Sequence, residues 1–321
     1  MELLKELTGK YGTSGRENKI REYIKGQALP YADEVETDVL GNLIVHKKGS
    51  GKRIMMAAHM DEIGVIVTFI DDNGFLRFSG VGGLNTKDIL YNRVVFENGV
   101  TGVIGTEKEN KDKVISKFFI DIGAKDKIEA EKMVSVGDMA TFDGGFVKSG
   151  DTVISKALDN RAGCYVLIEA LKQAKTENDL YFVFTVQEEV GLRGAKTSAY
   201  GINPDMAIAI DVTDTGDTPN AEDMAVKLGK GAAIKVMDSS VLCDSTIRTG
   251  LIECAKGKGI PYQLEVMTDG GTDAGAISVT RAGIKTGGIS IPTRYIHSPS
   301  EMASISDIEN CVKLLVEFIG K

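Results

Sequence analysis

Short, nearly continuous apolar runs alternate with segments of helical periodicity along most of this chain, and this alternation constrains the fold more than any other feature. The runs cover residues 53–61, 180–189, 205–212, 231–238 and 284–292. The helical segments between them cover residues 160–175, about 191–200, 246–257 and about 273–282. Strands that are apolar throughout are buried on both faces, so the pattern predicts an α/β fold with a mostly parallel sheet flanked by helices.

Three further segments complete the predicted α/β domain. Residues 17–28 are amphipathic with helical spacing, and Ser14 is a candidate capping residue for that helix. Residues 35–49 alternate around a Gly-Asn turn, which indicates a hairpin. Residues 306–320 form a last predicted helix, with Ser306 as the expected start of a capping box.

The middle of the chain has a different pattern. Here short alternating strands are separated by frequent Gly and Asn-Gly turns, with one short helical piece at residues 126–134. This pattern is typical of a small β barrel or sandwich. Because it interrupts the α/β pattern after the first sheet strand, we predict an α/β domain of residues 1–67 and 153–321 that carries an inserted β domain, residues 68–152.

Composition argues against several classes of partner and location. The 321 residues are 42% apolar, enough for a sizeable core, and the net charge of −8 argues against nucleic acid or an anionic membrane surface as partner. No run approaches the roughly 18 apolar residues of a membrane span, and the N-terminus lacks an apolar signal core. Four cysteines without CxxC spacing, at positions 164, 243, 254 and 311, are expected to be buried thiols in a reducing compartment. We therefore expect a soluble, cytoplasmic protein.

Histidines and acids follow the apolar runs at the end of the sheet where α/β proteins place their sites. These residues are His59 with Asp61, Glu188 with Glu189, Asp211, His297, and Asp159 just before a helix. Taken singly, each has an ordinary explanation as a cap, a turn residue or a solvated side chain. Their joint position favours a metal site. The third histidine, His46, is expected to be an ordinary solvated residue on a strand.

The residue types indicate which metal and which chemistry. Imidazoles and carboxylates without thiolates suit Zn²⁺, Co²⁺ or Mn²⁺, and one bridging carboxylate would allow two ions about 3.5–4 Å apart. Cations would also offset the repulsion between the adjacent carboxylates of Glu188 and Glu189. With Glu189 as a ligand, Glu188 would be free to act as general base on the attacking water. Asp61 points to the same side of an extended backbone as His59 and could accept its free N–H.

Five motifs, in order, resemble those of the tetrahedral (TET-type) dinuclear metallo-aminopeptidases: AAHMDEIG, SKALDNRAG, FTVQEEVGLRGA, AIDV and RYIHSPSE. Members of that family are labelled glutamyl or deblocking aminopeptidases and sometimes endoglucanases, and the resemblance covers nearly the whole chain. It implies that His59 and Asp211 bind one metal, that Glu189 and His297 bind the other, and that Asp159 bridges them. By the same resemblance, Glu188 would be the general base and Asp61 would orient His59.

The resemblance also implies an architecture and an assembly. The catalytic domain would be phosphorylase/hydrolase-like, and the PDZ-like insert would serve in dimerisation. Dimers of the family commonly form a hollow tetrahedral dodecamer that short peptides enter. This chain is somewhat short for the family, so loops that shape the specificity pocket or the cavity are expected to be trimmed.

The expected function is metal-dependent hydrolysis of N-terminal residues from short peptides, with two Zn²⁺ or Co²⁺ ions per subunit and Mn²⁺ as a further option. Three alternatives stay open: an amidohydrolase or deacylase on a related fold, a cellulase, and a non-catalytic, metal-stabilised assembly protein. Glycosidases usually use two carboxylates without a metal, and a chain without Trp has few sugar-stacking platforms. Residues 268–276 have two explanations. Their glycines could let the backbone approach a substrate closely, so that the segment lines the site; alternatively, Thr272 or Asp273 only caps the next helix.

Overall fold

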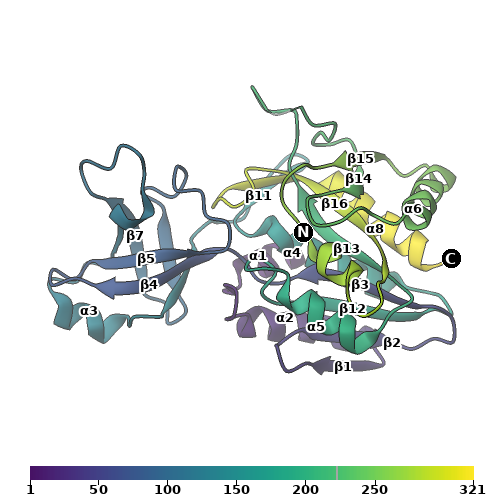
Figure 1. Ribbon diagram of the computed structural model, residues 1–321, viewed down its shortest axis with the longest axis horizontal. Helices are drawn as coiled ribbons and strands as arrows, with labels where there is room; N and C mark the ends of the chain where they lie inside the picture. Colours follow the sequence, from purple (N-terminus) through teal and green to yellow (C-terminus); the bar gives the residue numbers. More distant parts are fainter. Residues whose placement is uncertain (222) are drawn as a thin grey trace.

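Two separately packed parts make up the chain, which the computed structural model describes at residues 1–221 and 223–321 (Figure 1). The larger part is an α/β domain built on one sheet, and the smaller part is a closed antiparallel barrel at its side. The predicted fold class, a mostly parallel sheet flanked by helices with an inserted small β barrel, is confirmed.

Parallel strands form the centre of the large sheet, and each coincides with a predicted apolar run. In spatial order they are β12 (Asp179–Thr185), β3 (Arg53–His59), β13 (Met206–Thr213) and β16 (Lys285–Arg294). Antiparallel strands extend both edges of this core. They are the expected hairpin of β1 (Glu34–Thr37) and β2 (Leu43–Lys47) beside β12, and, beyond β16, β17 (Glu301–Ser304), β11 (Thr152–Ser155) and β10 (Val147–Ser149). A side branch from β16 holds β14 (Ala232–Met237) and β15 (Tyr262–Val266).

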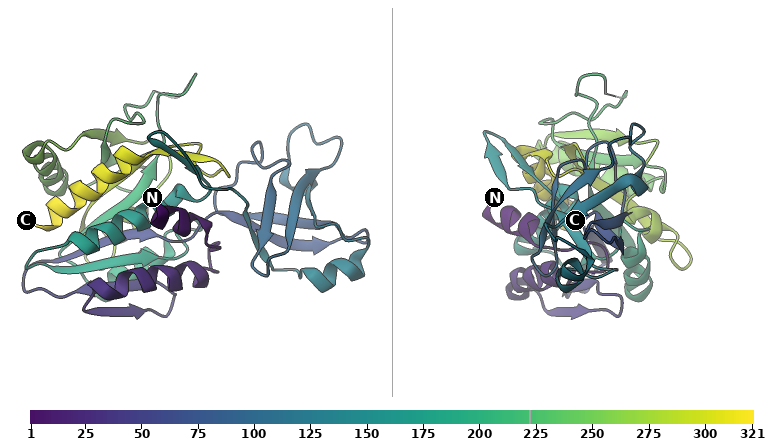
Figure 2. Two further views of the ribbon diagram at one scale, coloured as in Figure 1. Left: turned by 180° about the vertical axis from the view of Figure 1, so that it is seen from behind. Right: turned by 90° about the vertical axis from the view of Figure 1, so that its left-hand side faces the viewer.

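Helices cover both faces of this sheet (Figure 2). One face packs against α1 (Glu2–Gly9), α2 (Asn18–Ala28), α4 (Leu158–Gln173), α6 (Ser245–Lys258) and α8 (Ile305–Ile319). The other packs against α5 (Arg193–Ile202) and α7 (Asp273–Ser278). A short 3-10 turn, η1 (Leu29–Tyr31), follows α2. Along β3, Ile54 and Met56 enter the first core while Met55 and Ala57 enter the second, which explains why the run is apolar throughout.

The barrel has an apolar core of its own. Its strands, in order around the barrel, are β4 (Gly64–Ile70), β5 (Leu76–Val81), β8 (Phe118–Asp121), β7 (Thr101–Thr106), β6 (Arg93–Phe96) and β9 (Met139–Phe142). The helix α3 (Lys127–Met133) and the short turn η2 (Ile115–Lys117) complete it. The chain enters the barrel directly after β3 and returns to the large sheet through β10 and β11, so the barrel strands start before residue 68 and end before residue 152.

Two expected helix caps are wrong, because other groups claim the side chains. The hydroxyl of Ser14 donates to the buried carboxylate of Asp61 at 2.6 Å instead of capping α2. At the start of α8 the cap is Ser304, whose hydroxyl accepts the backbone N–H of Asp307, while Ser306 bonds to Asp151.

His46 and the four cysteines, which were expected to have no special role, differ in part from their expected burial. His46 is not fully solvated: its ring stacks on Tyr181 with centroids 4.1 Å apart, and its Nε2 lies 2.6 Å from Asp179. The described cysteines are free thiols, and Cys243 alone is only half-buried instead of fully buried. Among the described residues, no helix combines the length and apolarity needed to cross a membrane.

Candidate functional site

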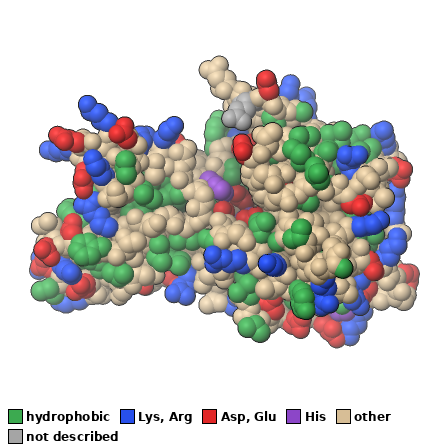
Figure 3. All heavy atoms as spheres, in the orientation of Figure 1, with side chains coloured by type: hydrophobic (Ala, Val, Ile, Leu, Met, Phe, Trp, Pro, Cys, Tyr) green, Lys and Arg blue, Asp and Glu red, His purple; other side chains and the backbone are tan. Residues whose placement is uncertain are grey.

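The carboxyl ends of the central strands open into one cavity of about 460 Å³ beside the barrel. Its lining includes these side chains singled out from the sequence: His59, Asp159, Glu188, Glu189, Asp211 and His297. In the space-filling view, an imidazole and several carboxylates are visible at the bottom of the cleft between the two parts (Figure 3). The parallel register delivers these residues together, because His59 ends β3, Asp211 lies in β13 and the two glutamates follow β12.

Asp159 lies between the two imidazoles and turns one oxygen toward each. Its Oδ1 is 3.1 Å from Nε2 of His59, and its Oδ2 is 3.2 Å from Nε2 of His297. The same nitrogen of His297 is 3.2 Å from Oε2 of Glu189. This is the arrangement that a carboxylate shared by two neighbouring cation sites requires.

Two further carboxylates complete the His59 side of the site. Oδ1 of Asp211 lies 3.7 Å from Nε2 of His59, and Oε2 of Glu188 lies 3.8 Å from the same atom. Candidate ligand atoms gather within 4.8 Å of one another in two sets that share His59, one with Asp159 and Glu189 and one with Glu188 and Asp211. The donors are imidazole nitrogens and carboxylate oxygens, which fit Zn²⁺, Co²⁺ or Mn²⁺.

Unpartnered oxygens support this fit. Oε1 of Glu189 is buried without a hydrogen-bond partner, and buried Oδ1 of Asp159 faces only the imidazole of His59. Buried carboxylate oxygens are normally bonded, because desolvation without a partner is costly. Oxygens left in this way around two imidazoles are the donors that a divalent cation would use.

The shifted pKa values of the buried acids and of His59 also indicate that this site lacks positive charge. Burial raises the pKa of Glu188 well above its usual range, and it also raises the pKa values of Glu189 and Asp211. Burial opposes charge on His59, but the surrounding carboxylates outweigh it and raise the imidazole pKa well above normal. Without cations, imidazole protons offset part of the carboxylate charge; divalent ions would replace those protons and supply more positive charge.

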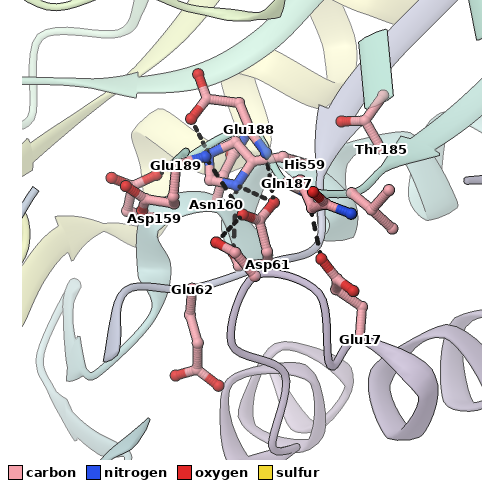
Figure 4. A network of polar contacts seen from close by, with 12 residues as sticks. Glu17, His59, Asp61, Glu62, Asp159, Asn160, Thr185, Gln187, Glu188 and Glu189 are labelled. Atoms are coloured by element: carbon pink, nitrogen blue, oxygen red, sulfur yellow. Dashed lines mark hydrogen bonds and ion pairs between the residues drawn. The ribbon is translucent and has the colours of Figure 1, made fainter. Parts of the chain in front are cut away.

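Asp61 holds the loop that carries the two adjacent glutamates (Figure 4). Its carboxylate accepts the backbone N–H of Glu188 at 3.0 Å and that of Glu189 at 3.2 Å. Nδ1 of His59 lies 3.2 Å from the backbone carbonyl oxygen of Asp61 and 3.5 Å from its carboxylate. The carbonyl is thus the nearer partner of the imidazole, whereas the sequence suggested the carboxylate alone.

Unusual backbone conformations cluster at the site. Ala157, Gln187, Leu192, Tyr295 and His297 all have positive φ, between 54° and 63°. Such conformations cost free energy in residues other than glycine and persist where the surroundings impose them. The loops before Asp159, around the two glutamates and at His297 are therefore held by contacts rather than by local preference.

The glycine-rich segment 268–276 forms part of the cavity wall. Gly270, Gly271 and Thr272 line the cavity, as the first of the two explanations required. Thr272 precedes α7 but makes no side-chain cap, and its hydroxyl donates to Asp238 at 3.1 Å. Asp273 is buried and accepts a hydrogen bond from Thr185 at 2.5 Å, and burial raises its pKa to about 7.

Sequence reasoning missed two contributors to the site. Glu301, the last residue of the motif RYIHSPSE, is buried and accepts backbone N–H groups from both Asp159 and His297. The barrel contributes Gly82 and Gly83, where added Cβ atoms would meet Glu189 and His297 respectively. The adjacent glycines were a visible signal, but no pattern in the sequence assigned them to this site.

Comparison with known proteins supports one family. The family model described as M42 glutamyl aminopeptidase matches residues 41–314. A protein of Acetivibrio thermocellus with aminopeptidase in its name is 58% identical over 322 residues, spanning 99% of this chain and 98% of that protein.

Solved structures agree in fold over the full length. An aminopeptidase from Desulfurococcus kamchatkensis is 42% identical with a TM-score of 0.96, covering 99% of this chain and 94% of that one. The TET1 peptidase of Pyrococcus horikoshii, described as able to assemble into a tetrahedron or a large octahedral shell, is 38% identical with a TM-score of 0.89 and 98% of each chain covered. The chain therefore belongs to the M42 glutamyl aminopeptidase family and is a peptidase.

Proposed function

We propose that this protein is a dinuclear metal-dependent aminopeptidase that removes N-terminal residues from short peptides. The observation that carries the proposal is Asp159, whose two carboxylate oxygens face His59 and His297 at 3.1 and 3.2 Å. His59 and Asp211 would hold one divalent cation, Glu189 and His297 would hold the other, and Asp159 would be shared. When bound, such ions polarise a scissile carbonyl and lower the pKa of an attacking water.

Glu188 is the proposed general base. Its carboxylate borders the cavity 3.8 Å from Nε2 of His59, and burial raises its pKa toward the range in which a carboxylate both accepts and returns a proton. It would take a proton from the attacking water and pass it to the leaving amine of the peptide. Asp61 would act indirectly, because its carboxylate fixes the backbone N–H of Glu188 and so the position of the base.

A metal and substrate panel tests this proposal. Chelator-treated protein is loaded separately with Zn²⁺, Co²⁺ or Mn²⁺ and given aminoacyl-p-nitroanilides, N-acyl amino acids and cellulose. We expect cleavage of unblocked aminoacyl substrates only; N-acyl cleavage would favour a deacylase, chelator-insensitive cellulose hydrolysis a glycosidase, and no turnover at all a non-catalytic assembly protein.

The role of Glu188 has its own variant. Glu188→Gln keeps the side-chain size and should retain both cations, while kcat falls by about 10²- to 10⁴-fold because the base is lost. Retained cations with substantial turnover would refute the base role, whereas lost cations would make Glu188 a ligand. That second outcome is a real alternative, since Glu188 lies in one of the two ligand sets.

We also propose a homo-oligomer with short peptides as substrates, with dimers formed through the barrel, residues 68–152, and assembled into a tetrahedral dodecamer. The tetrahedral and octahedral assemblies of the Pyrococcus horikoshii relative support this, as do large apolar side chains of the barrel that are more than half exposed: Phe69, Tyr91, Ile128 and Val136. Light scattering on the intact protein gives the subunit number. Free, mostly buried thiols support a cytoplasmic location.

A further inference from the structure

Glu301 lies between the two strands that deliver ligands to the proposed cation sites. It opens β17, which pairs with β11 on one side and with β16 on the other. The chain runs from β11 into the segment that carries Asp159, and from β16 into the loop that carries His297. The side chain of Glu301 therefore lies where it can contact both of these segments.

The Glu301 carboxylate uses one oxygen for each of these segments. Oε2 accepts the backbone N–H of Asp159 at 2.9 Å, and Oε1 accepts the backbone N–H of His297 at 2.9 Å. The side chain is only 2% exposed, so water does not compete for these bonds. Because the two oxygens belong to one rigid group, they fix the separation of two backbone amides that come from distant parts of the chain.

Local conformation does not fix that separation. His297 has φ of 63°, and Ala157, two residues before Asp159, has φ of 54°. Neither conformation is one that these residues prefer, so each segment needs an outside contact to keep its side chain in place. The Glu301 carboxylate is such a contact for both segments.

We propose that Glu301 is a positioning residue that sets the distance between Asp159 and His297 and thereby determines the affinity of the cation site formed by Asp159, Glu189 and His297. This inference rests on the proposed dinuclear function. It assigns Glu301 no contact with a cation or substrate. Groups that orient ligands in this way change metal affinity by about 10- to 100-fold when they are removed.

Glu301→Gln is the direct test, because the amide has the same shape but only one accepting oxygen. Its NH₂ group would face one of the two backbone N–H groups, so one of the two bonds must be lost. Glu301→Asp is the second variant: it keeps the carboxyl group, but its shorter side chain cannot reach both amides. Either variant is informative if the other fails to fold.

Asp307 offers a matched control six residues away. Its carboxylate also accepts two backbone N–H groups, from Gly229 at 2.6 Å and Gly231 at 2.7 Å, and it is fully buried. Neither partner is a proposed ligand, and neither lines the cavity. Asp307→Asn therefore removes the same kind of double contact and should weaken the fold without changing the cation sites.

The measurement is Co²⁺ titration of the chelator-treated intact protein, followed by calorimetry and by the visible absorption of bound Co²⁺. Wild type and Asp307→Asn should take up two ions with the same affinities and spectra. Both Glu301 variants should bind one ion normally and the other about 10- to 100-fold more weakly, with an altered spectrum for that ion. Excess Co²⁺ should restore the lost occupancy, and far-UV circular dichroism of the metal-free variants should match that of the wild type, which separates weaker binding from an unfolded fraction.

Two results would overturn the inference and are distinguishable from failure of the proposed function. If wild type bound two Co²⁺ ions and the Glu301 variants titrated identically, Glu301 would have no positioning role. If Asp307→Asn lost the same ion to the same degree, the effect would be general destabilisation. If wild type bound fewer than two ions, the dinuclear proposal itself would be wrong, and this inference with it.

Discussion

Replacing Gly83 by alanine should damage the proposed site from the side of the barrel. Gly83 follows β5, and a Cβ atom added there would lie 2.8 Å from Cε1 and Nδ1 of His297. Ordinary contact begins at 3.4 Å. The ring or the loop must therefore move by about 0.6 Å, the difference between the two distances, whereas metal–ligand distances tolerate only about 0.2 Å.

We expect Gly83→Ala to fold normally and to lose function. A displacement of this size at a ligand should lower kcat/KM by about 10- to 100-fold, since small misplacements of reacting groups have effects of that order. The assay combines aminoacyl-p-nitroanilide kinetics with the count of Co²⁺ ions bound at increasing free Co²⁺. Gly145→Ala is the matched control, because a Cβ atom there meets no atom within 4 Å.

The contact between the added methyl group and His297 is the expected cause of the loss, and two results would contradict it. Wild-type kinetics and normal cation uptake in Gly83→Ala would show that the barrel loop yields without disturbing the imidazole. An equal loss in Gly145→Ala would show that any added methyl group in these loops is harmful. Thermal unfolding of both variants separates either result from simple loss of folded protein.

Two predictions concern groups outside the site. Burial raises the pKa of Cys164 to about 12 and that of Cys311 well above its usual range, so both thiols should resist iodoacetamide at pH 8 in native protein and react after denaturation; rapid native labelling, read by mass spectrometry, would contradict this. Burial also raises the pKa of Asp307 to about 6 from an ordinary 3.8. The folded state therefore holds this proton more tightly than the unfolded state, and the contribution of Asp307 to stability is largest below pH 4 and is lost as the pH rises to 6. Denaturant unfolding should show the stability of wild type falling relative to Asp307→Asn over that range; a flat or rising difference would refute the assignment.

The sequence predicted the frame of the site because strand burial leaves a direct mark on residue type. Each central strand is apolar on both faces, so its end can be located, and His59, Glu188 and Asp211 stand at or just beyond such ends. Parallel pairing then brings those ends to one edge of the sheet without any further information. The same logic located the barrel, whose alternating strands and glycine turns differ from the rest of the chain.

The residues that hold the site were not predictable in this way. Glu301 bonds to the backbone of Asp159, 142 positions away in the chain, and a backbone amide has no letter in the sequence. Ser14 has the features of a helix cap, yet a buried carboxylate on another segment takes its hydroxyl. Patterns in a sequence report which side chains are buried, whereas these contacts depend on which backbone groups are left without a partner after the strands have paired.

The point at which the barrel interrupts the chain has a mechanical consequence. The polypeptide departs from the large sheet directly after His59 and rejoins it at β10, and β11 then leads to Asp159, whose side chain approaches that of His59 to 3.1 Å. The two connections between the barrel and the large sheet thus lead to neighbouring candidate ligand atoms. If the barrel forms the subunit contact proposed above, a displacement of the barrel in the assembly would reach His59 through only the short connection between β3 and β4.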